Sequence, residues 1–196
     1  MFELMYASQA VVDLNEREME ALLGVSRARN QEAGITGMLL HVHDVPAQEA
    51  FFVQILEGDQ EAIEQTFARI QTDELHTRVT VVHRAVAAQH SFPDWQMGLA
   101  TMDMTVAVDL ARHHPQAGQA GQAGPAGPAG AARSSLEMLS NAFLARIMLT
   151  LGARELRQHN RSETAGVIQH ADAQTLPATP TPAFFWRGPD GSPLPG

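Results

Sequence analysis

The sequence predicts an α+β fold in which two helices cover one face of a mixed five-stranded sheet. Short apolar runs bounded by turn residues, which are typical of strands, begin near residues 2, 35, 51, 78 and 96. Two segments with apolar side chains at helical spacing follow the first run and the third run. The order is therefore β-α-β-β-α-β-β over residues 1–102, which indicates a ferredoxin-like sandwich.

Bulk composition limits the possible functions. The 196 residues include 44% hydrophobic side chains, enough for one ordinary domain with further segments. The formal net charge of -9 disfavours non-specific nucleic-acid binding, which needs a basic face. The absence of cysteine excludes disulfides, thiolate metal sites and cysteine nucleophiles. No apolar run has the length of a membrane span and the N-terminus lacks a signal peptide, so we expect a cytoplasmic protein without a membrane partner.

The first helix has clear start and stop signals. Asn15 stands at its beginning with Glu18 three residues later, the spacing of a capping box. Gly34 is expected to end the helix just beyond Glu32. The face that should pack on the sheet consists of Leu14, Met19, Leu22, Leu23 and Ser26.

The strand at residues 51–58 carries an amide among apolar neighbours. Gln54 brings two N–H donors and a carbonyl acceptor, which need partners if the side chain is buried. The strand alone leaves two interpretations open, a glutamine bonded to backbone or solvent and a glutamine that binds a ligand. The preceding strand, residues 35–43, is expected to be its antiparallel hairpin partner through the connection that contains Pro46.

The second helix is predicted over residues 59–72 because Ile63, Phe67 and Ile70 share one face. A valine-rich strand, residues 78–86, follows it. A turn at Phe92-Pro93-Asp94-Trp95 then leads to a short fifth strand, residues 96–102.

The composition changes beyond the predicted sheet. Residues 103–133 are expected to form a flexible linker, because Gln-Ala-Gly and Pro-Ala-Gly repeats cannot bury a core. Residues 134–161 are predicted to form a C-terminal helix, and residues 162–196 a disordered tail. The Phe184-Phe185-Trp186 cluster in this tail is either a weakly docked end or a peptide-like anchor. The helix needs a partner, either the far side of the sheet or a second chain, for Leu136, Leu139, Phe143, Ile147 and Leu151.

One group of side chains is suited to binding a flat polar ring in a slot between the two helices. It combines a phenol, two amides, an indole and a thioether, namely Tyr6, Asn30, Gln54, Trp95 and Met97. These groups can recognise the edge of a planar heterocycle by hydrogen bonding, and a tyrosine close to such a ring can give up an electron. They include no general base with a suitable pKa and no activated nucleophile, so they favour binding over hydrolysis.

A second group lies at the end of the second helix. Arg69 and Asp73 are four residues apart, and His76 follows them. They form either an ordinary ion pair or a clamp for a ribityl or phosphate group. His41 and His43 share a strand face, but two ligands do not complete a metal site, so no metal is predicted.

Several motifs along residues 1–102 occur together in one known family. They are Leu4-Met5-Tyr6-Ala7-Ser8-Gln9-Ala10, Ser26-Arg27-Ala28-Arg29-Asn30, Gly34-Ile35-Thr36-Gly37-Met38-Leu39-Leu40, Phe52-Val53-Gln54-Ile55-Leu56-Glu57-Gly58, Asp73 with His76, and Phe92-Pro93-Asp94-Trp95-Gln96-Met97-Gly98. This combination resembles a BLUF domain, a blue-light sensor that holds a flavin without a covalent bond. The chain resembles the short kind, in which no enzymatic or DNA-binding domain follows.

The resemblance implies a role for each candidate residue. Tyr6 would donate an electron and a proton, and Gln54 would bridge Tyr6 and the flavin and rearrange its hydrogen bonds. Trp95 and Met97 would relay the change to the C-terminal region and a protein partner. The cofactor would be FAD, with FMN and riboflavin as alternatives, in a homo-oligomeric protein. Further flavin contacts would come from Ser26, Arg29, Asn30, Arg69, Asp73 and His76.

Three departures from the family pattern leave the tyrosine–glutamine pair intact. The connection around residues 44–50 is longer than usual, His90-Ser91-Phe92 replaces a basic residue, and Arg29 stands where Asn or His is common.

Two other functions fit the same fold. A flavin-dependent oxidoreductase would need substrate room beside flavin N5, which Tyr6 and Gln54 would crowd. An interaction module would have lost the flavin. The sequence favours a photosensor without enzymatic output.

Overall fold

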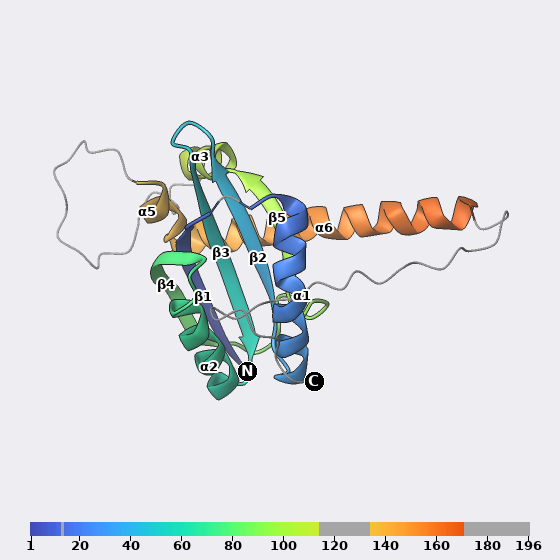
Figure 1. Cartoon of the computed structure of the whole chain (residues 1–196), viewed down its shortest axis with the longest axis horizontal. Helices are drawn as coiled ribbons and strands as arrows, with labels where there is room; N and C mark the ends of the chain where they lie inside the picture. Colours follow the sequence, from blue (N-terminus) through green and yellow to red (C-terminus); the bar gives the residue numbers. More distant parts are fainter. Residues whose placement is uncertain (13, 114–133, 171–196) are drawn as a thin grey trace, which may run out of the picture. The chain divides into compact units, whose positions relative to one another are not determined.

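A mixed five-stranded sheet organises the computed structural model, which describes residues 1–12, 14–113 and 134–170 (Figure 1). The strands are β1 (Phe2–Ala10), β2 (Thr36–Asp44), β3 (Glu49–Gly58), β4 (His76–Val86) and β5 (Gly98–Asp103). Their order across the sheet is β4-β1-β3-β2-β5, and all neighbouring pairs are antiparallel except β2 with β5. The predicted fold class, the element order and the β2–β3 hairpin are confirmed.

The helices α1 (Glu16–Glu32) and α2 (Gln60–Gln71) cover one face of the sheet, as predicted (Figure 1). The capping box at the start of α1 is present, because Asn15 Oδ1 accepts from Glu18 N while a Glu18 carboxylate oxygen accepts from Asn15 N. Gly34 follows α1 with a φ of 63°, a conformation that suits glycine. Asp59 caps α2 by accepting hydrogen bonds from two backbone N–H groups of its first turn.

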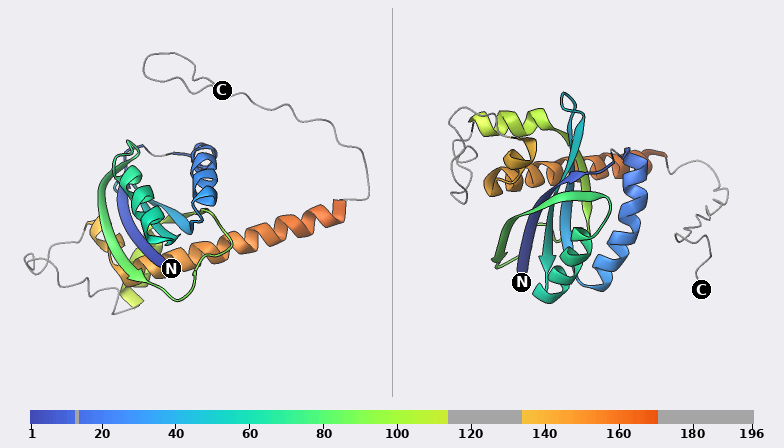
Figure 2. Two further views of the ribbon diagram at one scale, coloured as in Figure 1. Left: turned by 90° about the horizontal axis from the view of Figure 1, so that it is seen from below. Right: turned by 60° about the vertical axis from the view of Figure 1, so that its left-hand side comes forward.

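The other face of the sheet is covered by α3 (Met104–His113), α5 (Ser135–Leu139) and α6 (Ala142–His170). In the left view of Figure 2, α6 passes across the face opposite to α1 and α2. Its side chains are described as far as Arg161, where the compact unit Met1–Arg161 ends. Core residues from this part of α6 include Leu144, Ala145, Met148, Leu149 and Ala153. The partner of the predicted apolar helix is therefore the far side of the sheet.

Three boundaries beyond the sheet differ from the sequence expectations. Residues 104–113 form helix α3, so the linker predicted over 103–133 is wrong for its first part; residues 114–133 lie outside the described residues. The helix predicted over 134–161 is divided into α5 and α6. The tail predicted over residues 162–196 is wrong for its first part, because α6 continues to His170; residues 171–196, which include the Phe184-Phe185-Trp186 cluster, lie outside the described residues.

The division between α5 and α6 changes which residues face the core. Asn141 Oδ1 accepts from Leu144 N at 2.9 Å, so the asparagine starts a new helix. This restart shifts the helical phase relative to an uninterrupted helix. Leu136 and Leu139 are buried as predicted, whereas Phe143 is 37% exposed.

Gly37 allows β2 to lie close to β3 beneath the two helices. A Cβ added at this position would lie 2.1 Å from the backbone oxygen of Ile55. The Gly37 N–H also donates to Trp95 O at 3.0 Å, which ties the segment before β5 to the sheet. Only glycine fits this position, because the obstructing atom belongs to the backbone.

Candidate functional site

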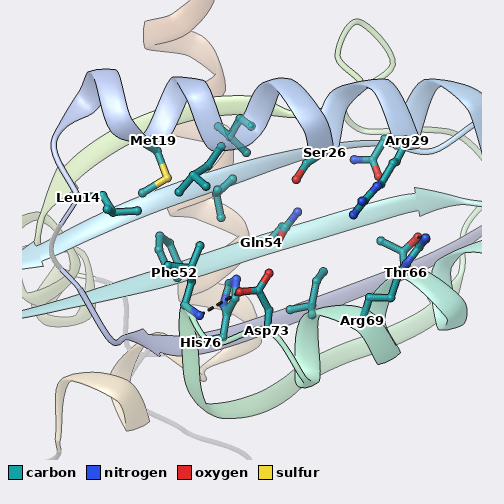
Figure 3. A pocket seen from close by; sticks show the side chains of 16 residues that line it. Leu14, Met19, Ser26, Arg29, Phe52, Gln54, Thr66, Arg69, Asp73 and His76 are labelled. Atoms are coloured by element: carbon teal, nitrogen blue, oxygen red, sulfur yellow. Dashed lines mark hydrogen bonds between the residues drawn. The ribbon is translucent and has the colours of Figure 1, made fainter. Parts of the chain in front are cut away.

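A slot opens between α1 and α2, with β3 as its floor (Figure 3). It contains about 820 Å³ of empty space, part of which is open to solvent. Leu22 lines the slot and is nevertheless 41% exposed. The remaining apolar lining comes from Leu14, Met19, Leu23, Leu39, Phe52, Ile70 and Leu75. The slot therefore has an apolar lining that could pack against both faces of a flat ligand.

The polar groups of the slot come from elements far apart in the sequence. Gln54 stands on the floor, and Figure 3 shows Arg29 and Arg69 at one end, on opposite sides of the slot. Asp73 and His76 lie on the α2 side (Figure 3). The predicted cofactor-binding residues that line the slot are Ser26, Arg29, Asn30, Gln54, Arg69, Asp73 and His76. Tyr6 is the member of that set that lies behind the lining, in contact with Gln54.

Tyr6 and Gln54 form the buried centre of the site. They are paired residues of β1 and β3, and the Tyr6 hydroxyl donates a hydrogen bond to Gln54 Oε1. Gln54 Nε2 donates in turn to Met97 Sδ at 3.1 Å. Burial raises the pKa of Tyr6 above its usual value, and the negative charge of Asp73 raises it further. Tyr6 is therefore a protonated phenol that can donate to the amide at neutral pH.

The segment before β5 attaches to the site through its backbone. Arg27 Nε donates to Met97 O at 2.8 Å, and Asn30 Nδ2 donates to Gln96 O at 2.8 Å. Asn30, which was expected to contact the flavin, holds this segment against α1 through that hydrogen bond. Neither backbone contact was foreseen from the sequence.

Trp95 does not join the other candidates in the slot, so its predicted place beside Tyr6 and Gln54 is wrong. Its indole packs against the core of the opposite face, whereas Met97 belongs to the core beneath α1 and α2. The chain bends at Gln96 and Met97 before β5 begins at Gly98. This bend turns the two side chains toward opposite faces of the sheet.

Arg69 and Asp73, at the end of α2, bond to other partners and do not form the ion pair that their four-residue spacing would allow. Arg69 Nη2 donates to Thr66 Oγ1 at 3.0 Å, and Asp73 Oδ1 accepts from Leu75 N at 2.9 Å. His76 Nδ1 lies 2.9 Å from Ser8 Oγ, a contact that the sequence did not suggest. Burial lowers the pKa of His76, while Asp73 acts in the opposite direction. A neutral imidazole therefore faces the slot.

Glu57 is a structural anchor that sequence reasoning missed. Its side chain is fully buried, and its carboxylate accepts from Ser91 N at 2.9 and 3.1 Å and from Phe92 N at 3.0 Å. These bonds connect β3, which carries Gln54, with the segment that carries Met97. The only local signal was an acidic residue before the glycine that ends the strand.

The histidines of β2 form part of an aromatic cluster. The rings of His41 and His43 have centroids 4.2 Å apart, and His41 stacks on Phe52 at 5.2 Å. The described residues contain no group of three or more His, Asp or Glu side chains that could hold a metal ion.

Within the same part of the chain, no helix has the length and apolar character needed to cross a bilayer.

The fold and slot define an α+β domain with a pocket between two helices on one face of its sheet, and comparison with known proteins gives its family. Residues 1–98 match the family model of BLUF, described as sensors of blue-light using FAD. Because this match covers half of the chain, the protein belongs to the BLUF family.

Individual relatives agree with this family. Over 102 residues the chain is 36% identical to the photoactivated adenylate cyclase subunit beta of Euglena gracilis and 33% identical to that of Euglena longa. Each match covers 52% of this chain and only 11% of the relative. The solved structure of BlsA in its photo-activated state has a TM-score of 0.51 and 24% identity, and the similarity covers 76% of this chain and 94% of that one. This last comparison supports the fold.

Proposed function

We propose that this chain is a blue-light photoreceptor that binds FAD between α1 and α2 and responds through Tyr6 and Gln54. The observation that carries the proposal is the hydrogen-bond chain from the Tyr6 hydroxyl through the Gln54 amide to Met97 Sδ. Gln54 is the member of this chain that also lines the slot. An amide in this place can respond to a bound ring on one side and to a phenol on the other.

The residues of the slot fit a flavin. Leucine, methionine and phenylalanine side chains supply apolar contacts for both faces of a flat tricyclic ring. Gln54 supplies amide groups for the polar edge of the ring, and Asn30 has a second N–H and a carbonyl in addition to the donor bonded to Gln96 O. Arg29 and Arg69 supply positive charge for a phosphate. These two charges favour FAD or FMN over riboflavin.

A bound flavin supplies the absorption of blue light and an electron acceptor when it is excited. Tyr6 would be the donor of an electron and, through the hydrogen bond that its hydroxyl makes to Gln54 Oε1, of a proton. Gln54 would relay the proton without holding it, and when the electron and the proton returned to Tyr6 the amide of Gln54 would be left in a new orientation. The rearrangement is inexpensive because the amide N–H leaves a thioether sulfur, which is a weak acceptor.

The output of this photoreceptor is a contact with another protein rather than catalysis. Gln54 is bonded to Met97, and the backbone beside Met97 is held by Arg27 and Asn30 of α1. A change in the amide is thereby passed to the segment before β5. That segment borders α6, which presents a helix surface to a partner.

The test is a light-minus-dark absorption spectrum of the purified protein. We expect a yellow protein whose flavin band shifts to the red under blue light and returns in the dark. Protein that stays colourless with added FAD and FMN would contradict the proposal and favour an interaction module. Turnover of a reduced nicotinamide would favour an oxidoreductase. Chromatography of the released cofactor distinguishes FAD, FMN and riboflavin.

A further inference from the structure

Helix α6 holds Trp95 on the side of the sheet away from the slot. The guanidinium carbon of Arg157 lies 4.7 Å from the centroid of the Trp95 ring. Arg157 Nη2 also lies 3.3 Å from Asp94 Oδ2. A guanidinium over an indole face at this distance is an attractive cation–π contact. One side chain of α6 thus contacts two consecutive residues of the segment before β5.

The packing beside this contact is close. A Cβ added at Gly98 would lie 3.3 Å from Trp95 Cδ2 and 3.2 Å from Leu156 Cδ2. The indole and the side chain of Leu156, the α6 residue before Arg157, therefore both lie close to Gly98, the first residue of β5.

The same short segment is bonded to the candidate photochemical pair on its other side. Met97 Sδ accepts from Gln54 Nε2, and Met97 stands two residues after Trp95. The Trp95 carbonyl accepts from Gly37 N, which fixes the backbone between the two side chains. Trp95 and Met97 are therefore joined by a short backbone segment whose carbonyls at Trp95, Gln96 and Met97 all accept hydrogen bonds.

We propose that Arg157 is a positioning residue for this site. It holds Trp95 against α6 and thereby keeps Met97 in contact with Gln54. The effect on the light response rests on the proposed photoreceptor function, whereas the effect on Trp95 does not. The ion pair with Asp94 contributes little, because the two side chains are 44% and 62% exposed. The contact with the indole contributes about fivefold to the equilibrium between held and released Trp95, as expected for a partly exposed cation–π pair.

The first measurement is acrylamide quenching of Trp95 fluorescence in the dark. The chain has two tryptophans, so the experiment uses the full chain with Trp186→Phe, which leaves Trp95 alone. Arg157→Gln is expected to raise the quenching constant at least about twofold, because the indole loses its cover. Arg157→Lys keeps a cation over the ring and should restore most of the protection. Arg154→Gln, an exposed position on the same helix, is the matched control for charge.

The second measurement is the rate at which the light-induced absorption shift decays in the dark. Arg157→Gln should change this rate at least about threefold relative to Arg154→Gln, while the melting temperatures of the two variants stay similar. A role limited to stability would lower the melting temperature and leave the rate unchanged.

The outcomes separate this proposal from the photoreceptor proposal. Equal quenching in Arg157→Gln and Arg154→Gln overturns the positioning role, whether or not the protein responds to light. Increased quenching with an unchanged decay rate also overturns it, because Trp95 would then be uncoupled from Gln54. Absence of any light-induced shift in the parent protein contradicts the photoreceptor function, and quenching then decides the placement of Trp95 by itself.

Discussion

Tyr6 of β1 and Gln54 of β3 are direct partners in an antiparallel strand pair, and the phenol donates to the amide oxygen. Side chains opposite each other on one face of such a pair are close neighbours. Their contact is therefore set by strand register, not by a flexible loop. A slip of one residue would turn one of them to the other face of the sheet. The candidate photochemical pair is as well defined as the sheet itself.

Replacing Tyr6 by phenylalanine should preserve flavin binding and abolish the normal light-induced shift. The aromatic ring still fills the space beside Phe67, with which Tyr6 has a centroid distance of 5.5 Å. The hydroxyl that donates to Gln54 is lost. Flavin content and light-minus-dark spectra measure the two effects separately. An unchanged photocycle in this variant would refute the role assigned to Tyr6.

Replacing Gln54 by leucine should also abolish the shift, because an aliphatic side chain cannot bridge two polar partners. The variant leaves the buried Tyr6 hydroxyl without its acceptor, which should reduce the free energy of unfolding by about 1–3 kcal/mol. Urea denaturation and the light-minus-dark spectrum test both effects. Gln65→Leu, at an exposed position of α2, is the control and should leave both unchanged. A normal red shift in the Gln54 variant would remove the amide from the mechanism.

Alkaline titration should show that the only tyrosine stays protonated while the protein is folded. Burial and the charge of Asp73 raise the pKa of Tyr6, so tyrosinate absorption should not appear near pH 10, the usual pKa of tyrosine. Below about pH 10 the phenol is protonated in both the folded and the unfolded chain, so the raised pKa of Tyr6 costs no stability there. Above it, the unfolded chain releases the proton and the free energy of unfolding falls by about 1.4 kcal/mol per pH unit.

The variant Tyr6→Phe supplies the comparison for this titration. It lacks the ionisable phenol, so it should lose less stability than the parent as the pH rises above about 10. Urea denaturation of both proteins between neutral and alkaline pH gives the difference. Parallel curves, or tyrosinate absorption that develops in the folded parent near pH 10, would contradict the burial of the phenol.

Replacing Glu57 by glutamine should destabilise the protein although the change is isosteric. The carboxylate accepts from the N–H groups of Ser91 and Phe92, whereas an amide would present an N–H to one of these donors. The expected loss is about 1–3 kcal/mol in the free energy of unfolding. Glu64→Gln is the control, since its ion pair with Arg84 is partly exposed and worth at most about 1 kcal/mol. Similar losses for the two variants would show that Glu57 is no anchor.

Two glycine-to-alanine variants should have opposite effects on the melting temperature. A methyl group at Gly37 would meet the Ile55 backbone oxygen. Overpacking of this kind costs about 1–3 kcal/mol, so the free energy of unfolding of this variant should fall by that amount or more. A methyl group at Gly24, on the exposed side of α1, meets nothing within 4 Å and should stabilise the helix by about 0.5–1 kcal/mol. Thermal denaturation compares them directly. A stable Gly37→Ala variant would contradict the close β2–β3 approach.

The features predicted correctly from the sequence were those with strong local signals. The capping box of Asn15 and Glu18 and the glycine after α1 depend on neighbouring residues only. Side chains two residues apart on a strand share a face, so the strand predicted over residues 51–58 placed Gln54 on the same face as Phe52 and Leu56, beneath the two helices. Most of the slot could be predicted because its residues lie on these regular elements.

The features missed depend on contacts between distant segments. The orientation of Trp95 follows from a bend before β5 and from Arg157 of α6, and no short motif encodes either. Helix α3 follows β5 directly and gains its stability from buried Met104 and Ala107, so composition alone did not separate it from the repeats after it. The restart of the helix at Asn141 needed a side chain whose capping role is visible only in three dimensions.

The placement of Trp95 also bears on which side chain loses an electron to an excited flavin. Tryptophan, like tyrosine, can serve as a donor, and an indole in the slot would compete with the phenol and divert absorbed photons into an unproductive route. Here the indole packs against the core on the opposite face and lies beneath the positive charge of Arg157, which makes oxidation of the ring harder. Under the proposed photoreceptor function, this placement would keep a rival electron donor out of the slot.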